Sequence, residues 1–167
     1  MRFAFAALIF AAPVFAQNLH PNFPAACGPE RVNFRVKHDS TLHTLARPEP
    51  GKALVYFIEA IGGDPAFGPS FAIRIGIDGT WVGANGNNSY FSVSVAPGEH
   101  HMCANPQSRF WMGRVVELAH FTTVAGKVYY FRTRYTSQGY LFLDALDSDE
   151  GNYWIATFPL AVSTPKK

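Results

Sequence analysis

Four adjacent residues, His100, His101, Met102 and Cys103, carry side chains that can bind a transition metal. On a strand, His100 and Met102 project to one face, and His101 and Cys103 project to the other. Neither pair completes a site, so copper or zinc would need a further ligand such as His120. The other histidines, none at a recognisable spacing, are His20, His38 and His43. We interpret these residues as strand histidines and keep a metal- or small-ligand-binding site at His100–Cys103 as the alternative.

Catalytic residue types are present without a catalytic pattern. The chain lacks the Gly-x-Ser-x-Gly elbow of many serine hydrolases. Its acidic cluster, Asp144, Asp147, Asp149 and Glu150, is typical of a solvated helix start and lacks the ordered alternation of a calcium loop. We therefore expect no catalytic residues and no cofactor, and an uncharacterised hydrolase is the third hypothesis.

Aromatic side chains make up 15% of the chain, enough to form a sugar- or peptide-binding platform if several were exposed together. In a sheet protein most of them pair across strands or fill the core. The best candidates for exposed, ligand-contacting aromatics are Phe110 and Trp111, which follow the Asn105-Pro106-Gln107 segment.

The two cysteines, Cys27 and Cys103, predict a disulfide in an oxidising compartment. The chain-entropy model credits such a long loop with roughly 4 kcal/mol. The competing interpretation is a lipidated Cys27. It is disfavoured because Cys27 lies well past the apolar leader and Pro24-Ala25-Ala26 lacks the usual aliphatic residue.

The first sixteen residues have the plan of a signal peptide. A positive start at Arg2 is followed by an apolar run over 3–15 and by small or permissive residues up to Ala16. The run is shorter than the about 20 residues that a membrane-spanning helix needs. We expect cleavage after Ala16, a mature chain from Gln17 without a transmembrane segment, and a periplasmic or secreted location.

Charge excludes one class of partner. Without Arg2, the 14 basic residues fall to 13 against 12 acidic ones. A nearly neutral chain lacks the concentrated basic surface on which nucleic-acid binding depends, so we expect no nucleic-acid partner.

Alternating apolar residues, with glycine and proline between the runs, predict an all-β fold. We expect an antiparallel β-sandwich of about eight or nine short strands, with a partly open barrel as the alternative. The acidic cluster predicts one short helix near 148–157. The expected organisation is a signal peptide (1–16), an extended segment (17–30), a single sandwich domain (31–158) and a flexible tail (159–167).

Five segments in this order are similar to a bacterial domain-of-unknown-function family, number 2846. They are 51–57 (GKALVYF), 78–79 (DG), 89–91 (SYF), 97–100 (PGEH) and 125–132 (AGKVYYFR). The 97–100 turn also resembles the hairpin of small surface β-domains of the Pro-Glu-Gly-Ala type. The resemblance implies an exported or lipoprotein-like envelope β-domain and no assigned activity. The leading hypothesis is therefore a non-catalytic exported module that binds a protein or another component of the cell envelope.

Overall fold

The structure is a computed structural model that describes residues 23–41, 45–60, 72–86, 88–107, 115–136 and 139–167. The predicted signal peptide lies outside these ranges, as do residues 17–22 of the segment expected to be extended. The described ranges contain ten strands and one helix: β1 (Phe34–Asp39), β2 (Ala53–Glu59), β3 (Ile73–Ile77), β4 (Thr80–Asn85), β5 (Ser89–Val95), β6 (Gly98–Pro106), β7 (Glu117–Thr123), β8 (Val128–Tyr135), β9 (Leu141–Leu146), α1 (Ser148–Thr157) and β10 (Leu160–Pro165).

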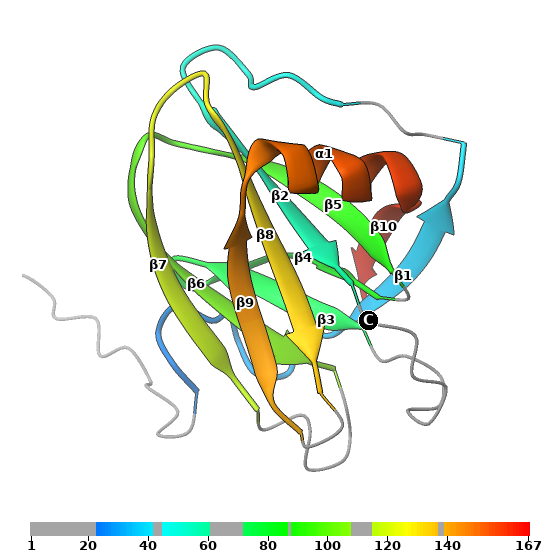
Figure 1. The fold of residues 1–167 in the computed structure, drawn as a ribbon. Coiled ribbons are helices and arrows are strands. Elements are labelled where there is room, and N and C mark those ends of the chain that lie inside the picture. The colour runs from blue at the N-terminus through cyan, green and yellow to red at the C-terminus, as the bar shows by residue number, and fades with distance from the viewer. Residues whose placement is uncertain (1–22, 42–44, 61–71, 87, 108–114, 137–138) are drawn as a thin grey trace, which may run out of the picture.

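The strands form two sheets whose inner faces share one apolar core (Figure 1). Sheet A has the order β1-β10-β5-β2-β8-β9, and sheet B has the order β4-β3-β6-β7. This arrangement confirms the predicted all-β sandwich. The strands belong to two separate sheets, so the barrel alternative does not describe them.

Strand direction differs from the prediction in sheet A. Sheet B is antiparallel throughout, but β2 pairs with β8 in parallel, and β10 pairs with β5 in parallel. Both parallel pairs join segments that are far apart in sequence. Local turn signals, which predict hairpins between neighbours, carry no information about such pairs.

β2 explains why the run after Lys52 is almost wholly apolar. Ala53, Val55 and Phe57 face the core between the sheets. Residues on the other face of β2 form a second cluster with Tyr90, Tyr130 and Ile155, because α1 covers that face (Figure 1). A strand buried on both faces has no reason to alternate.

The predicted helix is confirmed as α1. Ser148, whose hydroxyl could have capped the first turn, is its first residue, and the cap is Asp147. The Asp147 carboxylate accepts a hydrogen bond from the Glu150 amide over 2.8 Å. A Cβ added at Gly151 would lie only 2.4 Å from the Tyr130 ring, which shows how closely the helix packs on sheet A. Ile155 on the same side is buried.

The segment 159–167, expected as a flexible tail, is an integral part of sheet A. Residues Leu160–Pro165 form β10, which pairs antiparallel with β1 along its whole length. Only the last two residues, Lys166 and Lys167, follow the strand. The sandwich therefore extends beyond residue 158, and its first and last described strands lie side by side.

The pairs Asp78-Gly79, Pro97-Gly98 and Ala125-Gly126 lie between apolar runs and predict tight turns, which the backbone confirms. Asp78 and Gly79 have φ values of 49° and 83°, as a type I′ hairpin turn requires. Gly98 and Gly126 also have positive φ. Apolar alternation predicts a core that includes Leu54, Tyr56, Ile73, Ile75, Phe91, Val93, Val128 and Tyr130. All of these side chains are buried except Val93 and Val128, which are half-buried. Within the described ranges, no helix is long and apolar enough to cross a membrane.

Candidate functional site

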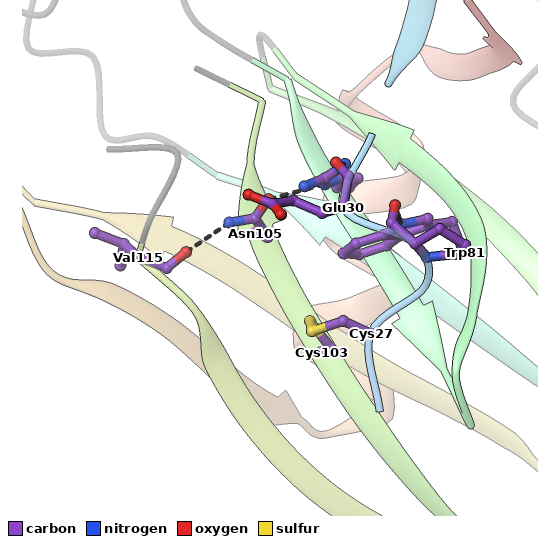
Figure 2. Close-up of a disulfide and its surroundings, with 8 residues drawn as sticks. Cys27, Glu30, Trp81, Cys103, Asn105 and Val115 are labelled. Atoms are coloured by element: carbon purple, nitrogen blue, oxygen red, sulfur yellow. Dashed lines mark hydrogen bonds between the residues drawn. A yellow bond between two sulfur atoms is a disulfide. The ribbon is translucent and has the colours of Figure 1, made fainter. Parts of the chain in front are cut away.

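The predicted disulfide between Cys27 and Cys103 is present, with the two Cα atoms 5.1 Å apart. It ties the segment before β1 to β6 on the outer face of sheet B (Figure 2). Both cysteines are buried in a cluster with Phe34 and Trp81. The bond is therefore enclosed by packed side chains and has a structural role.

Arg74 on β3 holds the same segment by a second set of contacts. Its guanidinium donates to the Glu30 and Val32 carbonyls and to Asn105 Oδ1, and it lies 4.3 Å from the Trp81 ring centre. Burial lowers the pKa of Arg74 to about 10, and the nearby Glu30 opposes that shift. The guanidinium is thus fully engaged in the fold.

His100 faces the interior and has both ring nitrogens occupied. Nδ1 lies 2.7 Å from Asp78 Oδ2, and Nε2 lies 2.8 Å from the Ala96 carbonyl oxygen. Both partners are hydrogen-bond acceptors, so the two nitrogens can donate together only when the ring is protonated, and the arrangement favours the imidazolium. Burial alone would lower the pKa of His100, but the bonds to Asp78 and Ala96 raise it overall. With no free nitrogen, this ring holds two turns together and is unsuited to bind a metal.

His101 and His120 lie on the opposite, exposed face of sheet B, directly across from each other in the β6·β7 register. The structure therefore brings these two predicted candidates together and separates them from His100. Cys103 is in the disulfide. No group of three or more His, Cys, Asp or Glu side chains that could hold a metal ion occurs in the described ranges.

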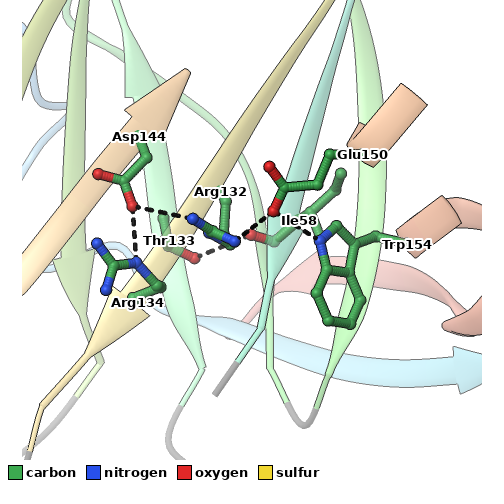
Figure 3. Close-up of polar contacts among 7 residues, drawn as sticks. All are labelled: Ile58, Arg132, Thr133, Arg134, Asp144, Glu150 and Trp154. Atoms are coloured by element: carbon green, nitrogen blue, oxygen red, sulfur yellow. Dashed lines mark hydrogen bonds and ion pairs between the residues drawn. The ribbon is translucent and has the colours of Figure 1, made fainter. Parts of the chain in front are cut away.

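The other predicted candidates divide between two outcomes. Phe110 and Trp111 lie outside the described residues. The acidic residues Asp144 and Glu150 both bind the Arg132 guanidinium, over 3.6 and 2.5 Å (Figure 3). Asp144 also accepts from Arg134 over 2.7 Å. Asp144 and Glu150 are both paired with arginines, so they form an ion-pair network between sheet A and α1 and not a free pair of acid groups.

An open groove of about 430 Å³ lies beside β1, which is the edge strand of sheet A. Its lining comprises Phe34, Arg35, Val36, His38, Ala72, Gly86 and Lys166. A second groove, of about 410 Å³, is lined by Arg35, Thr164, Pro165, Lys166 and Lys167. Arg35 and Lys166 line both grooves, so we treat the two grooves as one and call it the basic groove.

The basic groove follows a stretch of unpaired backbone. The Asn33 carbonyl accepts from the Lys166 amide, so Asn33 and alternate residues after it turn their polar groups toward β10. The backbone N–H and C=O groups of Phe34, Val36 and His38 therefore point away from β10, toward the free edge of the sheet. The Gln107 side chain bonds both the amide and the carbonyl of Phe34. Beyond Phe34, none of the residues that the structure describes pairs with the outward backbone groups of Val36.

The cations of the basic groove are also unpaired. Arg35, Lys166 and Lys167 are exposed, and none of them has an acidic partner among the residues whose placement is described. The His38 ring donates to the Gly86 carbonyl over 2.8 Å and so joins β1 to the turn after β4. The groove thus combines positive charge with free main-chain donors and acceptors.

A buried polar layer lies behind the basic groove, between the two sheets. It consists of Glu59, Asn85, Ser89 and Thr133, all with no exposed surface. A Cβ on Gly86, in the groove wall, would lie 3.4 Å from Glu59 Oε2. Burial raises the pKa of Glu59 to about 8, and neither of its oxygens has a hydrogen-bond partner among the described residues.

Sequence reasoning missed both features. The single acid in the apolar run KALVYFIEAI was a usable signal for the layer, because a carboxylate in a buried strand needs an explanation. The basic groove gave no local signal, since Arg35 and Lys166 meet only after β1 and β10 pair. No family model, curated protein or solved structure matches this chain. The similarity to family 2846 therefore stays a prediction.

Proposed function

We propose that this protein is an exported, non-catalytic β-sandwich of the bacterial envelope that binds an acidic, extended segment of a partner protein. The binding surface is the basic groove, and the partner adds a strand to β1. The observation that carries the proposal is the open backbone edge at Val36 beside the unpaired Arg35 and Lys166.

The chemistry of the groove favours this partner over a compact small molecule. An exposed sheet edge supplies main-chain hydrogen bonds to an incoming strand, and alternate side chains supply the selectivity. Here the selectivity is electrostatic, because the groove carries three cations without acids beside them. An extended segment with acidic alternate residues would satisfy both features at once.

The expected location agrees with the buried disulfide. Disulfides persist in oxidising compartments, and the Cys27–Cys103 bond supports the export that the leader predicts. An envelope location would also place the open edge where partner proteins are accessible.

Fluorescence anisotropy with a labelled peptide of alternating glutamate and valine tests the proposal. We expect saturable binding that weakens as salt rises, and at least about tenfold weaker binding to the double variant R35E/K166E. The matched control is R47E/K127E, which reverses two exposed charges that do not line the basic groove. It should bind the peptide like the wild type.

Two further peptides separate strand addition from simple charge attraction. The same peptide methylated on alternate backbone nitrogens should lose binding, and a lysine–valine peptide should not bind. Equal binding of the methylated peptide would show that the groove attracts acidic chains without pairing. Absence of binding to the unmodified peptide would leave Arg35 and Lys37 as charges that protect an edge from aggregation.

A further inference from the structure

The buried polar layer differs from the rest of the core because it contains side-chain oxygens that make no hydrogen bond to a described residue. On β2 the inward positions run Ala53, Val55, Phe57 and then Glu59, so the Glu59 carboxyl enters the space between the sheets. Ser89 and Thr133 stand opposite Glu59 on the neighbouring strands β5 and β8. Asn85 reaches the same place from sheet B.

Every side-chain donor of this layer is already used. The Asn85 amide nitrogen donates to the carbonyls of Phe57 and Ser89, over 3.0 and 3.1 Å. The Ser89 hydroxyl donates to the Gly86 carbonyl over 2.6 Å. The Thr133 hydroxyl donates to the Ile58 carbonyl over 3.4 Å, as Figure 3 shows.

Within this layer and the adjoining turn, only acceptor oxygens are left over. Among the residues that the structure describes, neither oxygen of Glu59 has a hydrogen-bond partner, and Oδ1 of Asn85 and Oδ1 of Asn88 in the adjoining turn are also buried without one. The orientation of Asn85 is fixed, because turning its amide over would point an oxygen at two carbonyls. Buried acceptors without donors cost free energy, and one proton on Glu59 could serve only one of them.

We propose that the buried polar layer binds one Ca²⁺ ion, with the carboxylate of Glu59 and the side-chain oxygens of Asn85 and Asn88 as protein ligands. Calcium accepts carboxylate and amide oxygens in flexible geometry, whereas magnesium keeps several waters and transition metals favour nitrogen or sulfur. One carboxylate matches the about 0.1–1 mM affinity of extracellular calcium modules. This proposal does not depend on the function of the basic groove.

Elemental analysis and thermal unfolding of the oxidised mature chain test the site. At a free calcium concentration about tenfold above the dissociation constant, equilibrium dialysis should measure about one bound Ca²⁺ per chain, and the unfolding midpoint should exceed that of protein treated with EDTA. The variant E59Q keeps the shape of the side chain and removes its charge. It should bind Ca²⁺ at least about tenfold more weakly and should lose the midpoint shift.

The control E99Q removes an exposed carboxylate on β6 and should respond to calcium like the wild type. Equal midpoint shifts in the wild type and E59Q would overturn the site. So would the absence of bound calcium together with a more stable E59Q protein in EDTA, which would identify Glu59 as a protonated core carboxyl.

Discussion

His100 shows how one buried side chain can hold two turns. Its ring joins Asp78, in the hairpin between β3 and β4, to Ala96, in the turn before β6. Asp78 Oδ1 also accepts from the His101 amide over 2.9 Å. Partial burial would raise the pKa of Asp78, but these bonds lower it overall. The Thr123 hydroxyl donates to the same Ala96 carbonyl over 2.8 Å.

Replacing His100 should change how stability depends on pH. A raised pKa means that the stabilisation is fully present below the unfolded value of about 6.5 and is lost as pH rises through the folded value. The unfolding free energies of wild type and H100Q should therefore converge as pH rises from about 6.5 through the raised folded pKa of His100. Urea denaturation at several pH values measures this difference.

His101→Gln is the matched control, because His101 is exposed on the same strand. The His101 ring lacks the two acceptors that hold the His100 ring, so this variant should not reproduce the pH-dependent loss of stability expected for H100Q. A constant difference between H100Q and the wild type would contradict an imidazolium bound at both nitrogens.

For single residues, the sequence shows which residue types are present but not which other residues they contact in the fold. The pairing of Cys27 with Cys103 followed from the count of two cysteines. Asp78 was recognised only as a turn residue, which concealed its bond to His100. Glu59 was interpreted as part of an apolar strand, because hydrophobic periodicity describes the run as a whole and gives no weight to its one acidic residue.

Among the elements, α1 depends on a glycine at its contact with sheet A. We expect Gly151→Ala to destabilise the protein by about 1–3 kcal/mol, because the new methyl group would overlap the Tyr130 ring. Helix propensity alone predicts the opposite sign, since alanine is better than glycine by about 1 kcal/mol within a helix. Chemical denaturation of the two proteins decides between these effects.

Tyr153→Ala provides the comparison within the same helix. Tyr153 is 61% exposed, so its loss should change stability by about 0.5 kcal/mol or less. A stabilised G151A protein would mean that α1 packs less closely on sheet A than the structure shows.

Elements with local signals were predictable, and those with distant partners were not. Alternation and Asp78-Gly79 predicted the β3–β4 hairpin, and the acidic cluster predicted α1. β10 ends in Pro165-Lys166-Lys167, which is typical of a tail, and its order comes from pairing with β1 at the far end of the chain. The basic groove could not be predicted for the same reason, because its two walls come from β1 and β10, which are far apart in the sequence.

For the whole molecule, the disulfide and the leader make one joint prediction. Protein recovered from the periplasm or the culture medium should begin at Gln17. Digestion without reduction should release a peptide that links Cys27 to Cys103. Mass spectrometry measures both features. Protein recovered from the cytoplasm with its leader and two free thiols would contradict the proposed location.

The features of the two proposals gather at one end of the sandwich. The basic groove runs along β1, and Glu59 lies behind its wall at Gly86. Within the described residues, β1 is held at several points: β10 pairs with it, Gln107 bonds the backbone of Phe34, and His38 joins it to sheet B. If a strand adds to β1 as proposed, an edge held in this way loses little entropy on binding.

The most direct test of the account is a titration of the labelled protein with the glutamate–valine peptide, followed by amide chemical shifts in NMR. Strand addition at β1 predicts the largest shifts at Val36, His38 and Lys166, with resonances of α1 unchanged. Shifts centred on α1, or none along β1 at a peptide concentration that saturates anisotropy, would contradict it.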